Sequence, residues 1–68
     1  MKNRVKQMRQ RRKLTQEALA KELGISRQSL ISIEKGKYAP SLPLAFAIAA
    51  FFDKNVEEIF IYDGNLES

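Results

Sequence analysis

The chain has 68 residues, which is enough for one small domain and too few for a large active-site cleft. It contains no cysteine and no histidine, so disulfides, thiolate nucleophiles and the usual zinc ligands are excluded. The net charge of +4 is unevenly distributed, because residues 1–37 carry +8 and residues 38–68 carry −4. This separation predicts that the N-terminal half meets a polyanion, with general solubilisation by basic residues as the alternative.

Targeting and membrane signals are the next features to consider. No apolar run approaches the length of a membrane span, and the basic first residues lack the apolar stretch of a signal peptide. The basic residues and the most apolar segment lie in different parts of the chain, which disfavours binding to a membrane surface. We therefore expect a cytoplasmic protein with no membrane partner, no metal ion and no cofactor.

Two helices are predicted in the N-terminal third of the chain. Residues 3–12 favour helix, with Val5 and Met8 on one face. Thr15 is a suitable N-cap for the second helix, because its hydroxyl can accept from the free N–H groups of the first turn. The buried stripe of that helix comprises Leu19, Ala20 and Leu23. Gly24 ends it, since glycine adopts positive φ at little cost.

Three more helices are predicted, each with its own N-cap. Ser26 follows that glycine closely and caps a third helix, and Ser41 caps a fourth. Asn55 opens a short fifth helix, because Glu58 three residues later completes a capping box. We predict an all-α domain of five helices.

The C-terminal tail has a different pattern. Ile61-Tyr62 is β-prone and is followed by the turn signal Asp63-Gly64, which allows a short C-terminal strand. We therefore expect the helical domain to occupy residues 1–60 and a tail, with a role in dimerisation, to occupy residues 61–68.

The second and third predicted helices carry a family resemblance. Ala20 is small where the two helices cross closely, and Ile25 pins the third helix onto the second. The linked positions are Gln16, Leu19, Ala20, Leu23, Gly24, Ile25, Ser26, Leu30, Ile33, Glu34, Gly36, Pro40 and Ser41. On these positions, residues 3–60 resemble the helix-turn-helix domain of the lambda-repressor, Cro and xenobiotic-response-element class of DNA-binding regulators. The resemblance implies a lambda-repressor-like fold whose third helix enters the major groove of B-DNA.

The resemblance places Arg27, Gln28 and Ser32 of the third helix where this family reads bases. Their chemistry agrees, because arginine suits the O6 and N7 atoms of guanine and glutamine suits the N6 and N7 atoms of adenine. A solvated helix face is the alternative reading of these side chains.

Contacts to DNA phosphates are expected on either side of the third helix. The four residues expected to make them are Gln16, Lys37, Tyr38 and Ser41. At position 39 many relatives carry a polar residue, whereas Ala39 cannot donate to a phosphate. Glu34 would repel phosphates if it were free, and the resemblance instead pairs it with Arg9 in a structural ion pair.

Residues 42–52 read LPLAFAIAAFF and contain no charged side chain. One face of this helix suffices for the core: Ala45, Ile48, Ala49 and Phe52. A helix that is apolar all round needs cover all round, which predicts a homodimer. The expected interface residues are Leu44, Ala47, Phe51, Ile61 and Tyr62. An exposed apolar helix is the alternative.

The leading functional hypothesis is a homodimeric, sequence-specific regulator that binds double-stranded DNA at a palindromic operator and acts as a repressor. The alternative is an antitoxin-type interaction module, whose apolar surface holds a toxin while the same helices bind promoter DNA. An enzyme is disfavoured, because the chain has no histidine, cysteine or glycine-rich phosphate loop.

Overall fold

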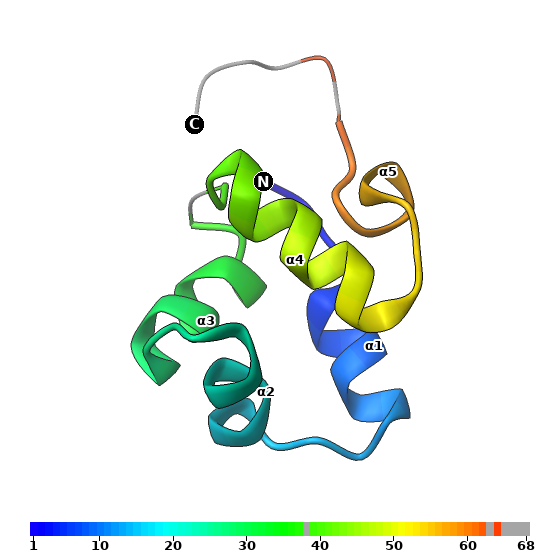
Figure 1. The fold of residues 1–68 in the computed structure, drawn as a ribbon. Helices are drawn as coiled ribbons and strands as arrows, with labels where there is room; N and C mark the ends of the chain where they lie inside the picture. The colour runs from blue at the N-terminus through cyan, green and yellow to red at the C-terminus, as the bar shows by residue number, and fades with distance from the viewer. Residues whose placement is uncertain (38, 63, 65–68) are drawn as a thin grey trace.

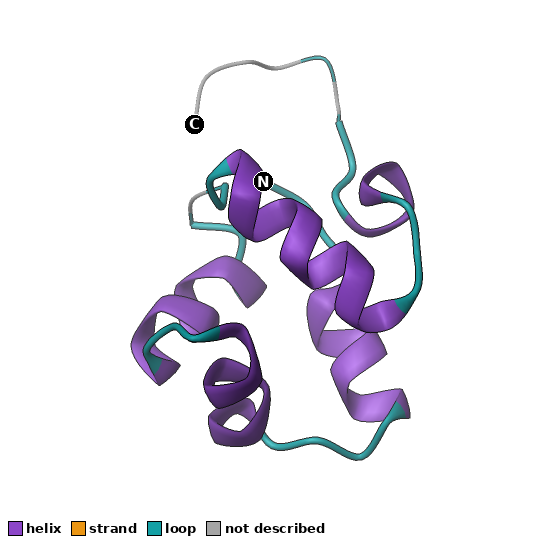
Figure 2. Cartoon of the chain, in the orientation of Figure 1, coloured by secondary structure: helices purple, strands orange, loops and turns teal. Residues whose placement is uncertain are grey.

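Five helices joined by short loops make up the described part of the chain (Figure 1). They are α1 (Val5–Arg11), α2 (Gln16–Leu23), α3 (Arg27–Glu34), α4 (Leu42–Phe52) and α5 (Val56–Ile59). The structure is a computed structural model that describes residues 1–37, 39–62 and 64. Figure 2 shows only helices and loops in this part of the chain. The prediction of an all-α fold with five helices is confirmed.

The predicted serine and threonine caps form at the helix starts. Thr15 Oγ1 accepts from the backbone N–H of Ala18 at 3.0 Å, at the start of α2. Ser26 Oγ accepts from the N–H of Ser29 at 3.0 Å, at the start of α3. The hydroxyl of Ser41 caps α4 in the same way. Each cap satisfies a backbone donor that the helix itself leaves free.

The turn between α2 and α3 consists of Gly24, Ile25 and Ser26. Gly24 has a φ of 70°, in the left-handed region that glycine adopts without steric penalty. The N–H of Ile25 donates to the carbonyl of Ala20 at 3.0 Å, and its side chain packs against the core. This short connection holds α3 against α2 in a fixed orientation.

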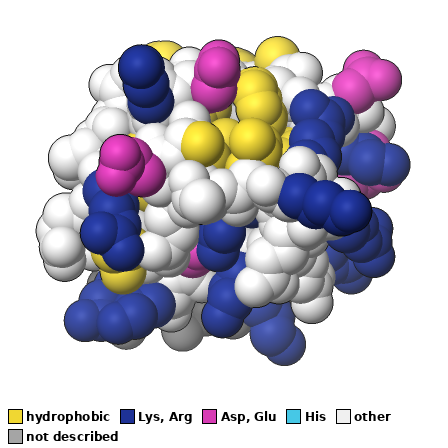
Figure 3. Space-filling view, turned by 90° about the horizontal axis from the view of Figure 1, so that it is seen from below, with side chains coloured by type: hydrophobic (Ala, Val, Ile, Leu, Met, Phe, Trp, Pro, Cys, Tyr) yellow, Lys and Arg dark blue, Asp and Glu magenta, His cyan; other side chains and the backbone are white. Residues whose placement is uncertain are grey.

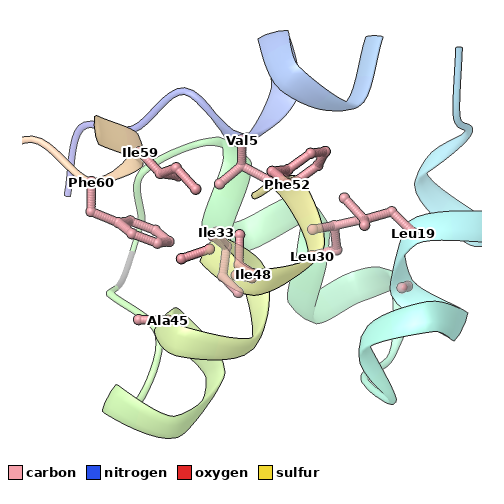
Figure 4. Close-up of a cluster of buried hydrophobic side chains, with 11 residues drawn as sticks. Val5, Leu19, Leu30, Ile33, Ala45, Ile48, Phe52, Ile59 and Phe60 are labelled. Carbon is pink, nitrogen blue, oxygen red and sulfur yellow. The ribbon is translucent and has the colours of Figure 1, made fainter. Parts of the chain in front are cut away.

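The core lies between the helices and draws on all five of them (Figure 4). Six of its side chains are completely or almost completely buried: Val5, Leu19, Leu30, Ile33, Ile48 and Ile59. Burial of each such side chain stabilises the fold by about 1.5–3 kcal/mol. The inward face expected for α4 is also observed, because its buried residues are Ala45, Ile48, Ala49 and Phe52.

The strand expected at Ile61-Tyr62 is not formed in the described residues. Asn3 and Phe60 make an isolated antiparallel bridge, and the N–H of Ile61 donates to the carbonyl of Lys2 at 2.9 Å. The pairing stays this short because the N-terminal segment turns into α1 at Val5. The tail therefore finds a partner within the same chain, over too few residues to count as a strand.

Asn3 ties the N-terminal segment to the end of α3. Its Nδ2 atom donates to the carbonyl of Ile33 at 2.8 Å, and its Oδ1 atom accepts from the N–H of Val5 at 3.1 Å. Gly36 follows α3 with a φ of 74°, and a Cβ atom there would lie 3.1 Å from the carbonyl oxygen of Met1. Glycine is therefore required for both the turn and the close approach, which together fix the chain that leaves α3.

Candidate nucleic-acid interface

The first turn of α3 stands free at the surface. Arg27 and Gln28 are both exposed, whereas Ser32, one turn further along, is partly covered. Helix α3 packs on α2 and α1 through its opposite face, where Leu30 and Ile33 are buried. An arginine and a glutamine at the exposed end of a helix can reach the edges of bases in a major groove.

An open depression lies between the start of α2 and the start of α3. It is lined by Arg9, Thr15, Gln16, Glu17 and Arg27. The fold therefore brings Gln16 and Arg27, which are predicted to contact phosphate and base respectively, to one concave surface. The free N–H groups at the start of α2 add partial positive charge beside them.

Arg9 and Glu34, which were expected to pair, form a short contact between α1 and α3. Arg9 Nε lies 2.7 Å from Glu34 Oε2, and Arg9 Nη2 donates to Glu34 Oε1 at 3.3 Å. The remaining guanidinium nitrogen, Nη1, donates to the carbonyl of Leu14 at 2.8 Å. The two side chains are only 10% and 3% exposed, so the Glu34 charge is neutralised and covered rather than presented to a ligand.

Gln16 also makes a structural contact that the sequence does not predict. Its Nε2 atom donates to Glu34 Oε1 at 3.1 Å, so the glutamine belongs to the same network as Arg9. One N–H of the amide is used in this bond and one is left for a phosphate. A covered carboxylate can accept more hydrogen bonds than the guanidinium group of one arginine donates to it. This remaining acceptor capacity of Glu34 is the signal from which a further donor could have been predicted.

Three of the predicted phosphate contacts belong to the chain that follows α3. Lys37 is exposed, and its backbone N–H donates to the carbonyl of Ser32 at 3.0 Å. Ser41 is exposed as well, and its oxygen accepts from the N–H of Leu44 at 3.3 Å, which leaves its O–H group free to donate elsewhere. Tyr38, the fourth predicted phosphate contact, lies outside the described residues.

Basic side chains lie around the end of the molecule where α2 is found. Figure 3 views this end and shows Lys and Arg side chains around the face, with several acidic side chains among them and an apolar patch near the centre. Arg12 is committed elsewhere, because its Nη1 atom donates to the carbonyl of Phe51 at 2.8 Å and its guanidinium lies 5.1 Å from the ring centroid of Phe52. Among the described residues, no acidic cluster could hold a metal ion and no helix is long and apolar enough to cross a membrane.

The apolar surface of α4 differs from the expected one. Leu44 and Phe51 were expected in a dimer interface, but both are partly buried and pack against the core of their own chain. The guanidinium of Arg12 lies 5.3 Å from the ring centroid of Phe51 and covers part of it. The large apolar side chains of α4 that stand in solvent are Leu42, 65% exposed, and Phe46, 57% exposed.

The other residues predicted for the interface vary in exposure. Ala47 and Tyr62 are exposed, and Tyr62 reaches 64%. Ile61 is half-buried beside the N-terminal segment. An exposed apolar surface thus exists on this side of the molecule, with Phe46 rather than Phe51 as its most prominent aromatic residue on α4.

Comparison with known proteins gives consistent matches over nearly the whole chain. The helix-turn-helix family model matches residues 5–59. An uncharacterized HTH-type transcriptional regulator of Methanocaldococcus jannaschii is 62% identical over 63 residues, which cover 93% of this chain and 96% of that protein. Similar regulators occur in Archaeoglobus fulgidus, with 48% identity and coverage of 93% and 89%, and in Bacillus subtilis, with 45% identity and coverage of 88% and 91%.

Proposed function

Because this chain belongs to the helix-turn-helix family, as its resemblance implied, we propose that it is a DNA-binding transcriptional regulator that acts as a homodimer on a palindromic operator. The observation that carries this proposal is the exposed first turn of α3, held beside the start of α2 with Arg27 and Gln28 facing outward. The names of the relatives, all HTH-type transcriptional regulators, support the same assignment.

Base recognition is assigned to Arg27, Gln28 and Ser32. Arg27 is suited to guanine, because its guanidinium can donate two hydrogen bonds to O6 and N7. Gln28 is suited to adenine, because its amide can accept from N6 and donate to N7. Ser32 is shorter and partly covered, so it makes the smallest contribution to discrimination.

Phosphate binding is assigned to the two ends of the recognition surface. Gln16, at the start of α2, offers its remaining amide N–H, and the backbone N–H groups of that helix end favour an anion. Lys37, Tyr38 and Ser41 are assigned to the phosphates further along the groove. These contacts set the register of α3 in the groove and contribute affinity that is independent of sequence.

Repression requires only that the dimer occupies its operator. A dimer that covers an operator within a promoter obstructs transcription, and this requires no surface beyond the helices that bind DNA and the partner. Two recognition helices related by a two-fold axis would meet half-sites about one helical turn apart, or about 34 Å. The target is therefore an inverted repeat.

Selection of bound sites from random double-stranded DNA tests the proposal. The wild-type protein should enrich an inverted repeat whose half-site centres are separated by about 10 bp. The matched control is the Arg27→Ala/Gln28→Ala variant, which should keep its helical circular dichroism and enrich no motif. A wild-type pool without any motif would contradict sequence-specific binding, and enrichment of a single asymmetric site would contradict the dimer.

A further inference from the structure

The outer face of α4 and α5 carries an exposed aromatic residue beside a small-residue hollow. Phe46 is 57% exposed on α4. It borders a depression whose apolar lining is completed by Ala49, Ala50 and Val56, from α4 and α5. The ring cannot fill the depression that it borders within its own chain. A protruding ring and a concave apolar surface are, however, the two complementary shapes that a contact with another molecule requires.

The same depression also carries one cation and one anion. Lys54 and Glu57 both line it and both are exposed. Within the described part of the chain, neither side chain makes an ion pair or a hydrogen bond. The surface therefore presents one unpaired positive group and one unpaired negative group at the border of an apolar patch.

The apolar surface continues beyond this depression. A second hollow shares Val56 and Glu57 with the first and is lined further by Leu42, Phe60 and Tyr62. Leu42 and Tyr62 are 65% and 64% exposed. The two hollows together form one apolar surface along α4 and α5. In Figure 1, α5 lies on the opposite side of the molecule from α3, so a partner seated there leaves the recognition helix free.

We propose that this surface is the homodimer interface, in which Phe46 of each copy enters the partner's depression and Lys54 pairs with the partner's Glu57. The inference rests on the homodimer of the proposed function and specifies its contacts. A two-fold interface must be complementary to itself, since residue i meets j while j meets i. A patch that contains a ring, a hollow, a cation and an anion meets that requirement.

A second copy fits this surface better than a charged partner does. DNA would meet the Glu57 carboxylate and exposed apolar side chains, both of which disfavour a phosphate backbone. A strongly acidic or strongly basic protein would find one favourable charge and one unfavourable one. A second copy related by a two-fold axis pairs both charges in one arrangement.

Charge exchange tests the interface without DNA. Sedimentation velocity at micromolar concentration and low salt would compare the wild type with Lys54→Glu and Glu57→Lys. Each single change places like charges opposite each other at both symmetry-related contacts, so dimer affinity should fall roughly tenfold or more. Lys6→Glu and Glu22→Lys change the net charge equally at exposed positions outside the depression and should leave the dimer unchanged.

A mixture of the two single variants provides the decisive measurement. In a heterodimer, the lysines of one chain face the glutamates of the other, so the equimolar mixture should form dimers while each variant alone sediments mainly as monomer. If Lys54 and Glu57 instead interacted within one chain, mixing would restore nothing. That result would overturn the proposed contacts.

Phe46→Ala tests the apolar part of the same interface. Loss of an aromatic anchor at two symmetry-related positions should weaken the dimer by about a hundredfold or more. The monomer should remain folded, because the side chain is mostly exposed. A wild-type dimer that tolerates both Phe46→Ala and the charge changes would place the interface elsewhere and leave the proposed function intact. A wild type that is monomeric while it binds the selected palindrome tightly would overturn the homodimer itself.

Discussion

Single residues divide between those that we propose to read DNA and those that hold the proposed recognition surface in place. Arg27 is exposed and has no described ion pair, whereas the guanidinium groups of Arg9 and Arg12 donate hydrogen bonds to groups of their own chain. The sequence predicts the Arg9–Glu34 pair through the family resemblance. It does not reveal that Gln16 completes this pair, because the contact joins residues 18 positions apart and depends on how α2 seats against α3.

At this scale we predict that Arg27 contributes base discrimination while Lys37 contributes mainly charge. Arg27→Ala should weaken binding to the preferred site by about 1–3 kcal/mol and should flatten the ranking of single-base variants of that site. Lys37→Ala should weaken all sites similarly and reduce the slope of log K against log salt by about one. Titrations of a small set of operator variants at several salt concentrations measure both effects. An unchanged ranking in Arg27→Ala would remove this residue from base recognition.

At the scale of helices, the sequence predicts contacts between residues that are neighbours in the chain. It does not predict contacts between segments that are far apart in the chain. Thr15, Ser26 and Ser41 each bond to a residue three positions later, so their caps follow from adjacent sequence. The face that α4 exposes depends on which segments pack around it. Leu44 and Phe51 are partly buried in their own chain, and the ring of Phe51 also lies against Arg12 from the end of α1. Their place in a dimer interface stays a prediction.

The contact between α1 and α3 should depend on both members of the Arg9–Glu34 pair. Removal of one partner, as in Arg9→Met or Glu34→Leu, leaves a covered charge without its counter-charge and should reduce the free energy of unfolding by roughly 3–5 kcal/mol. The double variant Arg9→Met/Glu34→Leu removes both charges and should regain much of that loss. Urea unfolding of the four proteins gives the coupling energy.

The network predicts a graded result for Gln16. Gln16→Ala removes one of three hydrogen bonds to Glu34 and should cost only about 0.5–1.5 kcal/mol. A cycle without coupling between Arg9 and Glu34 would mean that the pair adds nothing to the docking of α1 on α3.

At the scale of the whole molecule, the distribution of charge separates two surfaces. Residues 1–37 carry +8 and contribute the helices that we propose to face DNA, while residues 38–68 carry −4 and contribute the apolar surface of α4 and α5. The sequence predicts this division, because charge and hydrophobicity change together along the chain. It also predicts a dimer, but the residues that remain exposed on α4 become apparent only when all five helices are placed.

The proposed dimer presents two recognition helices to one operator. Each half-site supplies only part of the contacts, so binding of the second half-site is intramolecular and the full operator should be bound far more tightly than a duplex with one half-site. Insertion of about 5 bp between the half-sites rotates them to opposite sides of the duplex, where one dimer cannot reach both. Affinity for this spaced operator should fall to that of the single half-site.

Phe46→Ala supplies the control for this experiment. Because the change weakens the dimer and leaves Arg27 and Gln28 untouched, it should reduce binding to the full operator and leave binding to the single half-site unchanged. The spaced and unspaced operators should then differ little for this variant. If the wild-type protein bound both operators equally, its two recognition helices would be acting as independent monomers, and dimer symmetry would have no part in selecting the operator.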